Sequence, residues 1–262
     1  MRKALLLIPV AVLAVAGIAY AANSNVYTVS AGIKPMKSGT KKNPKPISLA
    51  ITYNIASSNS KAIPTNVKTY KTFIQQIIAK TNNFPACGTS RINNSHQGPS
   101  TCRKGSLIGG GWAIVDVYPS NRPALKAYGS KCSLQLSIYN GGNHTFSLYL
   151  FSGNKEDGYN PCKPKKKQAF VEQFSSNGNG LTGTFTIPAT FRSAGKNVWV
   201  IVRLHMTISV KTTKVGKKPH RTTIGLLDSV GCPANHQRQV KVTFTATDGT
   251  SGTATRLVPC TS

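Results

Sequence analysis

A strict alternation of apolar and polar residues is the feature that most constrains how this chain folds. Every second position between 198 and 210 is apolar: Val198, Val200, Val202, Leu204, Met206, Ile208 and Val210. From residue 203 onward the intervening positions are polar: Arg203, His205, Thr207, Ser209 and Lys211. Since successive side chains of a strand point to opposite faces, this period of two predicts one long strand with one face on a core.

The same alternation recurs along the chain. It covers residues 47–55, 134–138, 146–150, 181–187 and 240–246. Gly- and Asn-rich turns separate these segments, and the turn at 140–143 predicts a hairpin. About ten short strands with such turns predict an all-β fold, an antiparallel β-sandwich of immunoglobulin-like or jelly-roll-like type with little helix.

Two segments are candidates for helix. Residues 67–79 nearly fit a helical face but also contain many strand-favouring residues, so helix and strand both stay open. A short turn of helix is expected near 89–93. Because no Pro/Ser-rich linker divides the chain, we expect one domain over 22–262, with two packed subdomains as the alternative.

The first 21 residues have the three parts of a secretory signal peptide. Arg2 and Lys3 precede an apolar run over 4–18, and Ala19-Tyr20-Ala21 is a small-x-small cleavage signal. The alternative is an uncleaved membrane anchor, because the apolar run is just long enough to span a bilayer. We therefore predict a protein that is secreted or held at the cell surface.

The cysteines agree with export. Six are present: Cys87, Cys102, Cys132, Cys162, Cys232 and Cys260. In an exported chain an even number of cysteines predicts disulfides. The sequence alone does not choose the connectivity, and we favour pairing between neighbours along the chain: Cys87–Cys102, Cys132–Cys162 and Cys232–Cys260.

The charge is strongly positive, with 33 Lys and Arg against 6 Asp and Glu. It concentrates in three runs, at 34–45, 162–167 and 211–221, which form either one cationic end or two. The candidate anion-binding side chains are Lys163, Lys165, Lys166, Lys167, Lys214, Lys217, Lys218 and Arg221.

Three interpretations of this charge are open. The lysines keep exposed sheet edges from pairing, or they bind an anionic polymer of the cell envelope or a membrane surface, or they bind extracellular nucleic acid. The lysine runs lack the aromatic side chains on which bases stack, which argues against nucleic acid. We favour a non-enzymatic binding or structural module with affinity for anionic polymers.

Signals for catalysis, metal or cofactor binding are missing from the sequence. Gly105-Ser106 is followed by Gly109, one place too late for a Gly-x-Ser-x-Gly elbow, and no two histidines have metal-site spacing. Glu172 lies inside the apolar segment 170–174 and is expected to face solvent or to pair with a lysine. His205 is expected on the strand surface. We predict no catalytic residue, metal or cofactor; the alternative is a secreted hydrolase with an active site that matches no motif.

One segment resembles a known family. Residues 84–113 contain Phe84-Pro85-x-Cys87 and then Cys102-x-x-Gly105-Ser106-x-Ile108-Gly109-x-Gly111-x-Ala113. This pattern is similar to a motif in an uncharacterised family of exported proteins of high-GC Gram-positive bacteria, although Arg103 stands where members usually have Pro. The resemblance implies a β-sandwich with a signal peptide, and it implies no activity or ligand.

Overall fold

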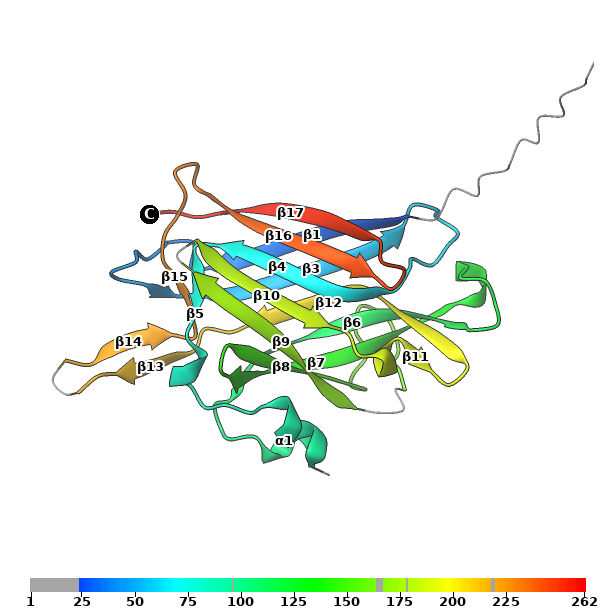
Figure 1. The fold of residues 1–262 in the computed structure, drawn as a ribbon, viewed down its shortest axis with the longest axis horizontal. Coiled ribbons are helices and arrows are strands. Elements are labelled where there is room, and N and C mark those ends of the chain that lie inside the picture. Colours follow the sequence, from blue (N-terminus) through cyan, green and yellow to red (C-terminus); the bar gives the residue numbers. More distant parts are fainter. Residues whose placement is uncertain (1–23, 96, 164–166, 178, 218–219) are drawn as a thin grey trace, which may run out of the picture.

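The computed structural model describes residues 24–95, 97–163, 167–177, 179–217 and 220–262 (Figure 1). Strands make up 58% of the chain, and helix is scarce. None of the helices in the described ranges is long and apolar enough to cross a membrane. The predicted signal peptide, residues 1–21, lies outside the described residues.

The strands and helices have the following bounds. The strands are β1 Asn25–Lys34, β2 Lys45–Pro46, β3 Ser48–Ser57, β4 Val67–Gln75, β5 Ile77–Ala79, β6 Leu107–Pro119, β7 Ser130–Gly142, β8 Thr145–Phe151, β9 Gln168–Asn177, β10 Gly180–Thr186, β11 Ser193–Ala194, β12 Asn197–Ile208, β13 Thr212–Val215, β14 Thr222–Gly225, β15 Leu227–Ser229, β16 Gln237–Ala246 and β17 Ser251–Pro259. The α-helix is α1, Thr89–Asn94, and short 3₁₀ turns span Thr81–Asn83, Gly98–Thr101, Lys126–Tyr128 and Ala189–Phe191. The helical turn predicted near 89–93 is confirmed.

Most strands belong to one antiparallel sheet. Eleven of them follow the order β1-β3-β12-β6-β7-β8-β9-β10-β4-β16-β17, and β11 pairs with β12 beside this path. The predicted hairpin at 140–143 joins β7 to β8. Two small sheets stand apart from this path, the β13–β14 hairpin and the three-stranded β2-β15-β5.

The large sheet curls until its two edge strands lie close together (Figure 1). Tyr27 of β1 stacks on Phe244 of β16, with ring centroids 4.4 Å apart. Gly252 of β17 lies against the same Tyr27 ring, where an added Cβ would come within 2.6 Å of ring atoms. The prediction of an all-β, antiparallel fold with little helix is confirmed; the separate sheets of a sandwich are not.

Inward-facing side chains of this sheet form the core. On β12 the predicted alternation holds for Leu204, Met206 and Ile208, which are buried. It is wrong for the first half of the segment, because a register shift between Ile201 and Arg203 places Trp199 and Ile201 in the core instead of Val198 and Val202. Val210 lies beyond the strand and is exposed. Tyr70 stacks on Phe185 with ring centroids 4.8 Å apart, and Tyr53 packs edge-on against Tyr70 at 5.5 Å. Burial of such large rings is a major part of the apolar area that stabilises a fold.

Residues 67–79 are strands β4 and β5, so of the two open alternatives the helix is wrong. β4 pairs with β10 on one side and β16 on the other. The register with β16 shifts between Thr245 and Ala246, which lets Val67 and Tyr70 both face inward despite their spacing of three. Gln76, with a φ of 55°, then interrupts the strand before Ile77. These two irregularities gave a strand the spacing of a helical face.

All six cysteines are paired between neighbours along the chain. Cys87–Cys102 closes the segment that contains α1, and Cys132–Cys162 ties β7 to the segment before β9. Cys232–Cys260 ties the segment after β15 to the one after β17. Each bridge closes a short stretch of chain, with separations of 15, 30 and 28 residues, and reduces the entropy of the unfolded state.

Candidate functional site: a cationic end and a grooved sheet face

Two of the three lysine runs lie at the same end of the large sheet. Lys34 is the last residue of β1 and pairs with Ser48, the first residue of β3. Ile208, the last residue of β12, pairs with the next residue of β3, Leu49. The antiparallel register therefore sends the segments 34–45 and 211–221 out from the same place (Figure 1). We call this end, formed by residues 34–45, 211–217 and 220–221, the cationic end.

Buried contacts hold the two segments together. β2, at the end of the first segment, pairs with β15, which follows the β13–β14 hairpin. The fully buried Arg238 donates hydrogen bonds to the hydroxyls of Ser38 and Ser229 and, at 2.8 Å, to the carbonyl of Gly231. Burial lowers the pKa of the Arg238 guanidinium. Its contacts hold Ser38 of the first segment beside Ser229, at the end of β15.

The side chains of the cationic end are mostly exposed cations. Those exposed to solvent are Lys34, Lys37, Lys41, Lys42, Lys214, Lys217 and Arg221, and Lys45 and Lys211 are half-buried. The acid at this end, Asp228, is buried and forms an ion pair of 2.9 Å with Lys80. Asp228 therefore does not neutralise the exposed positive charges of the cationic end.

The described residues of the third run lie at the opposite end. Lys163 and Lys167 are exposed and precede β9, whose first residue Gln168 pairs with Leu150 near the far end of β8. The structure thus separates Lys163 and Lys167 from Lys214, Lys217 and Arg221, and the charge does not form one patch. Lys165, Lys166 and Lys218 lie outside the described residues.

The outer face of the large sheet carries polar and aromatic side chains in register. Thr52 of β3, His205 of β12, Trp112 of β6 and Gln135 of β7 are successive cross-strand neighbours. The Trp112 and His205 rings lie 5.4 Å apart at an angle of 27°. His205 Nδ1 is 2.8 Å from the Thr52 hydroxyl and Nε2 is 3.1 Å from the Thr207 hydroxyl. Partial burial lowers the pKa of the His205 imidazole. The prediction that His205 lies on the surface of the strand is confirmed.

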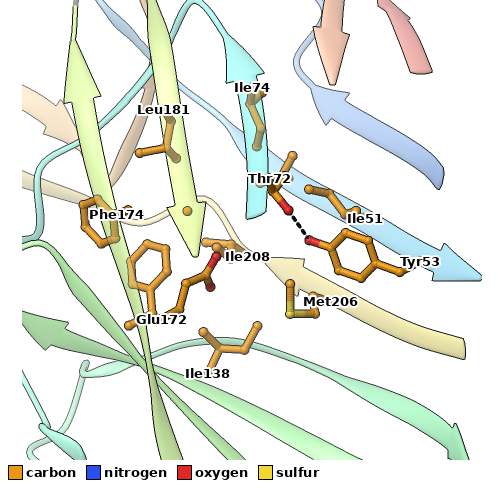
Figure 2. Close-up of a pocket in the computed structure, with 13 residues that line it drawn as sticks. Ile51, Tyr53, Thr72, Ile74, Ile138, Glu172, Phe174, Leu181, Met206 and Ile208 are labelled. Atoms are coloured by element: carbon orange, nitrogen blue, oxygen red, sulfur yellow. Dashed lines mark hydrogen bonds between the residues drawn. The ribbon is translucent and has the colours of Figure 1, made fainter. Parts of the chain in front are cut away.

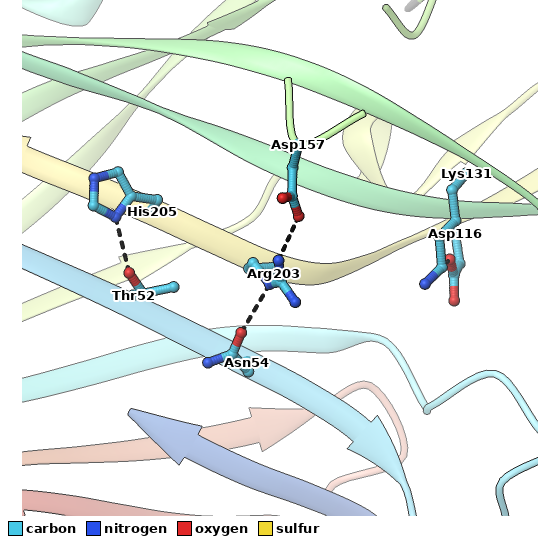
Figure 3. A network of polar contacts seen from close by, with 7 residues as sticks. All are labelled: Thr52, Asn54, Asp116, Lys131, Asp157, Arg203 and His205. Carbon is cyan, nitrogen blue, oxygen red and sulfur yellow. Dashed lines mark hydrogen bonds and ion pairs between the residues drawn. The ribbon is translucent and has the colours of Figure 1, made fainter. Parts of the chain in front are cut away.

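The turn before β9 folds over this face and places two acids on it. Asp157 pairs with Arg203, which also donates a hydrogen bond of 3.0 Å to the Asn54 side chain (Figure 3). Glu156 accepts a hydrogen bond of 2.7 Å from Gln135. Nothing in the amino-acid sequence indicates that these acids reach the sheet, because the contacts depend on how the turn folds back.

A groove of about 590 Å³ runs along this outer face. Gly109, Gly110 and Gly111 line it together with Trp112, Gln135, Glu156, His205 and Lys211. A Cβ on Gly109 or Gly111 would lie 2.0 or 1.9 Å from a backbone oxygen of β12, so only glycine fits there. We call this feature the sheet groove.

The carboxyl group of Glu172 lies in the interior of the large sheet, so the prediction for Glu172 is wrong. Glu172 is 9% exposed and faces the core between the apolar side chains of β9 and its neighbours (Figure 2). Within the described part of the chain no hydrogen bond or ion pair reaches its carboxyl group. Burial raises its pKa to about 7. It lines a cavity of about 30 Å³, which is about the volume of one water molecule in the liquid.

The remaining candidates for chemistry are Ser106 and a possible metal site. Ser106 is fully buried and donates a hydrogen bond of 2.7 Å to the Arg103 carbonyl, so it stabilises the turn that leads into β6. Among the residues that the structure covers, no three His, Cys, Asp or Glu side chains gather as a metal site would require.

The chain was compared with protein-family models, curated proteins and solved structures. No protein-family model, no curated protein and no solved structure matches the chain. The resemblance of residues 84–113 to a family of exported proteins therefore stays a prediction.

Proposed function

We propose that this chain is a secreted, non-enzymatic, single-domain protein that binds an anionic polymer of the cell envelope at its cationic end. The observation that carries this proposal is the meeting of two lysine runs, 34–45 and 211–221, at one end of the sheet. Asp228 does not neutralise the exposed cations at this end, because it is buried and paired with Lys80. A surface of this kind attracts polyanions by charge density.

Retention on immobilised polyphosphate at increasing salt tests the proposal. We expect the wild-type protein to bind at roughly 0.05 M salt and to elute as salt rises, because salt screens exposed charges and weakens polyanion binding. The triple variant Lys37→Gln, Lys41→Gln, Lys42→Gln should bind roughly a hundredfold more weakly, at about 1 kcal/mol for each lysine near an anionic surface.

A matched variant removes the same charge from the opposite end. Lys163, Lys167 and Lys196 are exposed, and their replacement by Gln changes the net charge by the same amount. This variant should bind almost as well as the wild type. Equal losses in both triple variants, or no retention of the wild type at low salt, would contradict the proposal. Vesicles of anionic lipid are the comparison for a membrane surface, which the exposed side chains of Met36 and Val210 would favour.

A second candidate function is hydrolysis in the sheet groove, because His205 and Glu156 both line it. A general base needs a ring nitrogen that is free to take a proton from the reactant. Both nitrogens of His205 already contact threonine hydroxyls, so binding is the better-supported function. Release of reducing ends from a polysaccharide, lost in His205→Gln, would reverse this preference.

A further inference from the structure

The sheet groove has the form of a binding site, and strand register explains why. On the outer face, the small residues Ala50, Thr207, Gly110 and Ser137 form one cross-strand row. The adjacent row is Thr52, His205, Trp112 and Gln135, of which the last three are large and planar. The small side chains beside these three leave a trough along the boundary of the two rows. Its volume of about 590 Å³ lies within the range of small-molecule sites.

The groove combines an aromatic surface with polar groups that suit hydroxyls. Trp112 is half-buried and presents a ring beside that of His205. Gln135 and Glu156 stand next to it, joined by a hydrogen bond of 2.7 Å. A carboxylate accepts hydrogen bonds, and an amide both donates and accepts them. A sugar ring offers apolar C–H groups on its face and hydroxyls around its edge, so it complements both parts.

The groove is also continuous with the cationic end. Lys211 lines the groove and belongs to the segment 211–221. A chain held by the lysines can therefore extend past Lys211 towards Trp112. Inside the groove the Glu156 carboxylate repels a phosphate, so the part of the ligand that enters carries hydroxyls rather than phosphate.

We propose that the polymer bound at the cationic end is an acidic glycan, and that the sheet groove holds one or two of its sugar rings. This inference rests on the proposed function, since charge brings the polymer to the protein. The groove then distinguishes a glycan from a polyanion without sugars. A single-stranded nucleic acid is disfavoured because its phosphates would lie close to Glu156.

Tryptophan fluorescence tests this assignment. The chain has two tryptophans, and Trp199 is buried at 5% exposure, so a ligand in the groove changes the emission of Trp112. Oligomers of hyaluronan, in which an uncharged sugar ring follows each acidic one, should change this emission, whereas polyphosphate should bind without changing it. Gln135→Ala should weaken hyaluronan binding roughly tenfold, the worth of about one hydrogen bond, and leave polyphosphate binding unchanged. Gln173→Ala, an exposed glutamine on β9, is the matched control and should change neither.

Each contrary result has a distinct meaning. If both polymers bind, but Trp112 does not respond and Gln135→Ala has no effect, the glycan assignment is wrong and the cationic end stands. If oligothymidylate changes the Trp112 emission more strongly than hyaluronan oligomers do, the groove binds nucleic acid and the assignment is again wrong. If neither polyphosphate nor hyaluronan binds at low salt, the proposed function itself fails.

Discussion

Glu172 shows how the environment of a single residue determines its chemistry. Its carboxyl group lies in the apolar interior, and Gly183 on β10 leaves room for it, since a Cβ there would lie 2.4 Å from Oε1. Water cannot solvate a carboxylate at this position as it does on the surface. The neutral, protonated form is therefore favoured, which raises the pKa to about 7.

This burial predicts a pH-dependent stability. Between the ordinary pKa of 4.5 and the folded pKa of about 7, the folded chain keeps a proton that the unfolded chain has lost. Rising pH therefore favours unfolding. The contribution to the free energy of unfolding should fall by about 3 kcal/mol from pH 4.5 to about pH 8. Urea unfolding of the wild type and of Glu172→Gln at both pH values measures it, because the amide does not titrate.

Asp248→Asn is the control for this prediction. Asp248 is exposed, and hydrogen bonds from Thr250 lower its pKa, so it titrates below the same window. The Asp248→Asn variant should therefore show the same pH dependence of the free energy of unfolding as the wild type between pH 4.5 and about pH 8. An identical pH dependence in the wild type and in Glu172→Gln would show that Glu172 is not buried.

The burial of Glu172 could have been predicted from its own strand. Phe170 and Phe174 lie two residues to either side, and a period of two places all three side chains on one face. The general rule that acids lie on the surface led to the opposite prediction. The interior position becomes certain only when neighbouring strands cover that face.

At the scale of elements, the close packing of β6 against β12 depends on glycine. Gly111→Ala would bring the new Cβ within 1.9 Å of the His205 carbonyl oxygen, a backbone atom that cannot move without shifting the strand. We expect a loss of about 1–3 kcal/mol in stability, as for other overpacked sites. Because the two strands also carry Trp112 and His205, the sheet groove should be distorted as well. Thermal or urea unfolding measures the change.

Gly32→Ala is the matched control for Gly111→Ala, because it also replaces a glycine within a strand. Gly32 lies on β1, and an added Cβ there meets no atom within 4 Å. This variant should be more stable than the wild type by about 0.5–1 kcal/mol, because alanine loses less backbone entropy on folding. Similar effects of the two substitutions would show that β6 and β12 are not packed as closely as described.

Much of the fold could be predicted from the sequence because strand alternation is a local signal. The segments 47–55, 198–210 and 240–246 lie largely within β3, β12 and β16. Residues 67–79 could not be assigned because a register shift and the positive φ of Gln76 imitate helical spacing. Such irregularities depend on partner strands far away in the sequence.

At the scale of the whole molecule, the strand order determines where the charge lies. The runs 34–45 and 211–221 are distant in the sequence, and the pairing of β3 with both β1 and β12 brings them to one end. The run 162–167 is as basic as the others but precedes β9 at the other end. Local composition could identify the lysines as candidates, but only the register shows which of them act together.

The central claim is that polyanions bind at the cationic end and not at the opposite end of the sheet. Lysine footprinting tests this claim most directly, because it uses the wild-type protein without substitutions. Acetylation of the wild type, with and without polyphosphate at low salt, measures by mass spectrometry which lysines the polyanion covers. We predict protection of Lys37, Lys41, Lys42, Lys214 and Lys217, and unchanged acetylation of Lys163, Lys167 and Lys196. Equal protection at both ends, or protection confined to Lys163 and Lys167, would contradict the account.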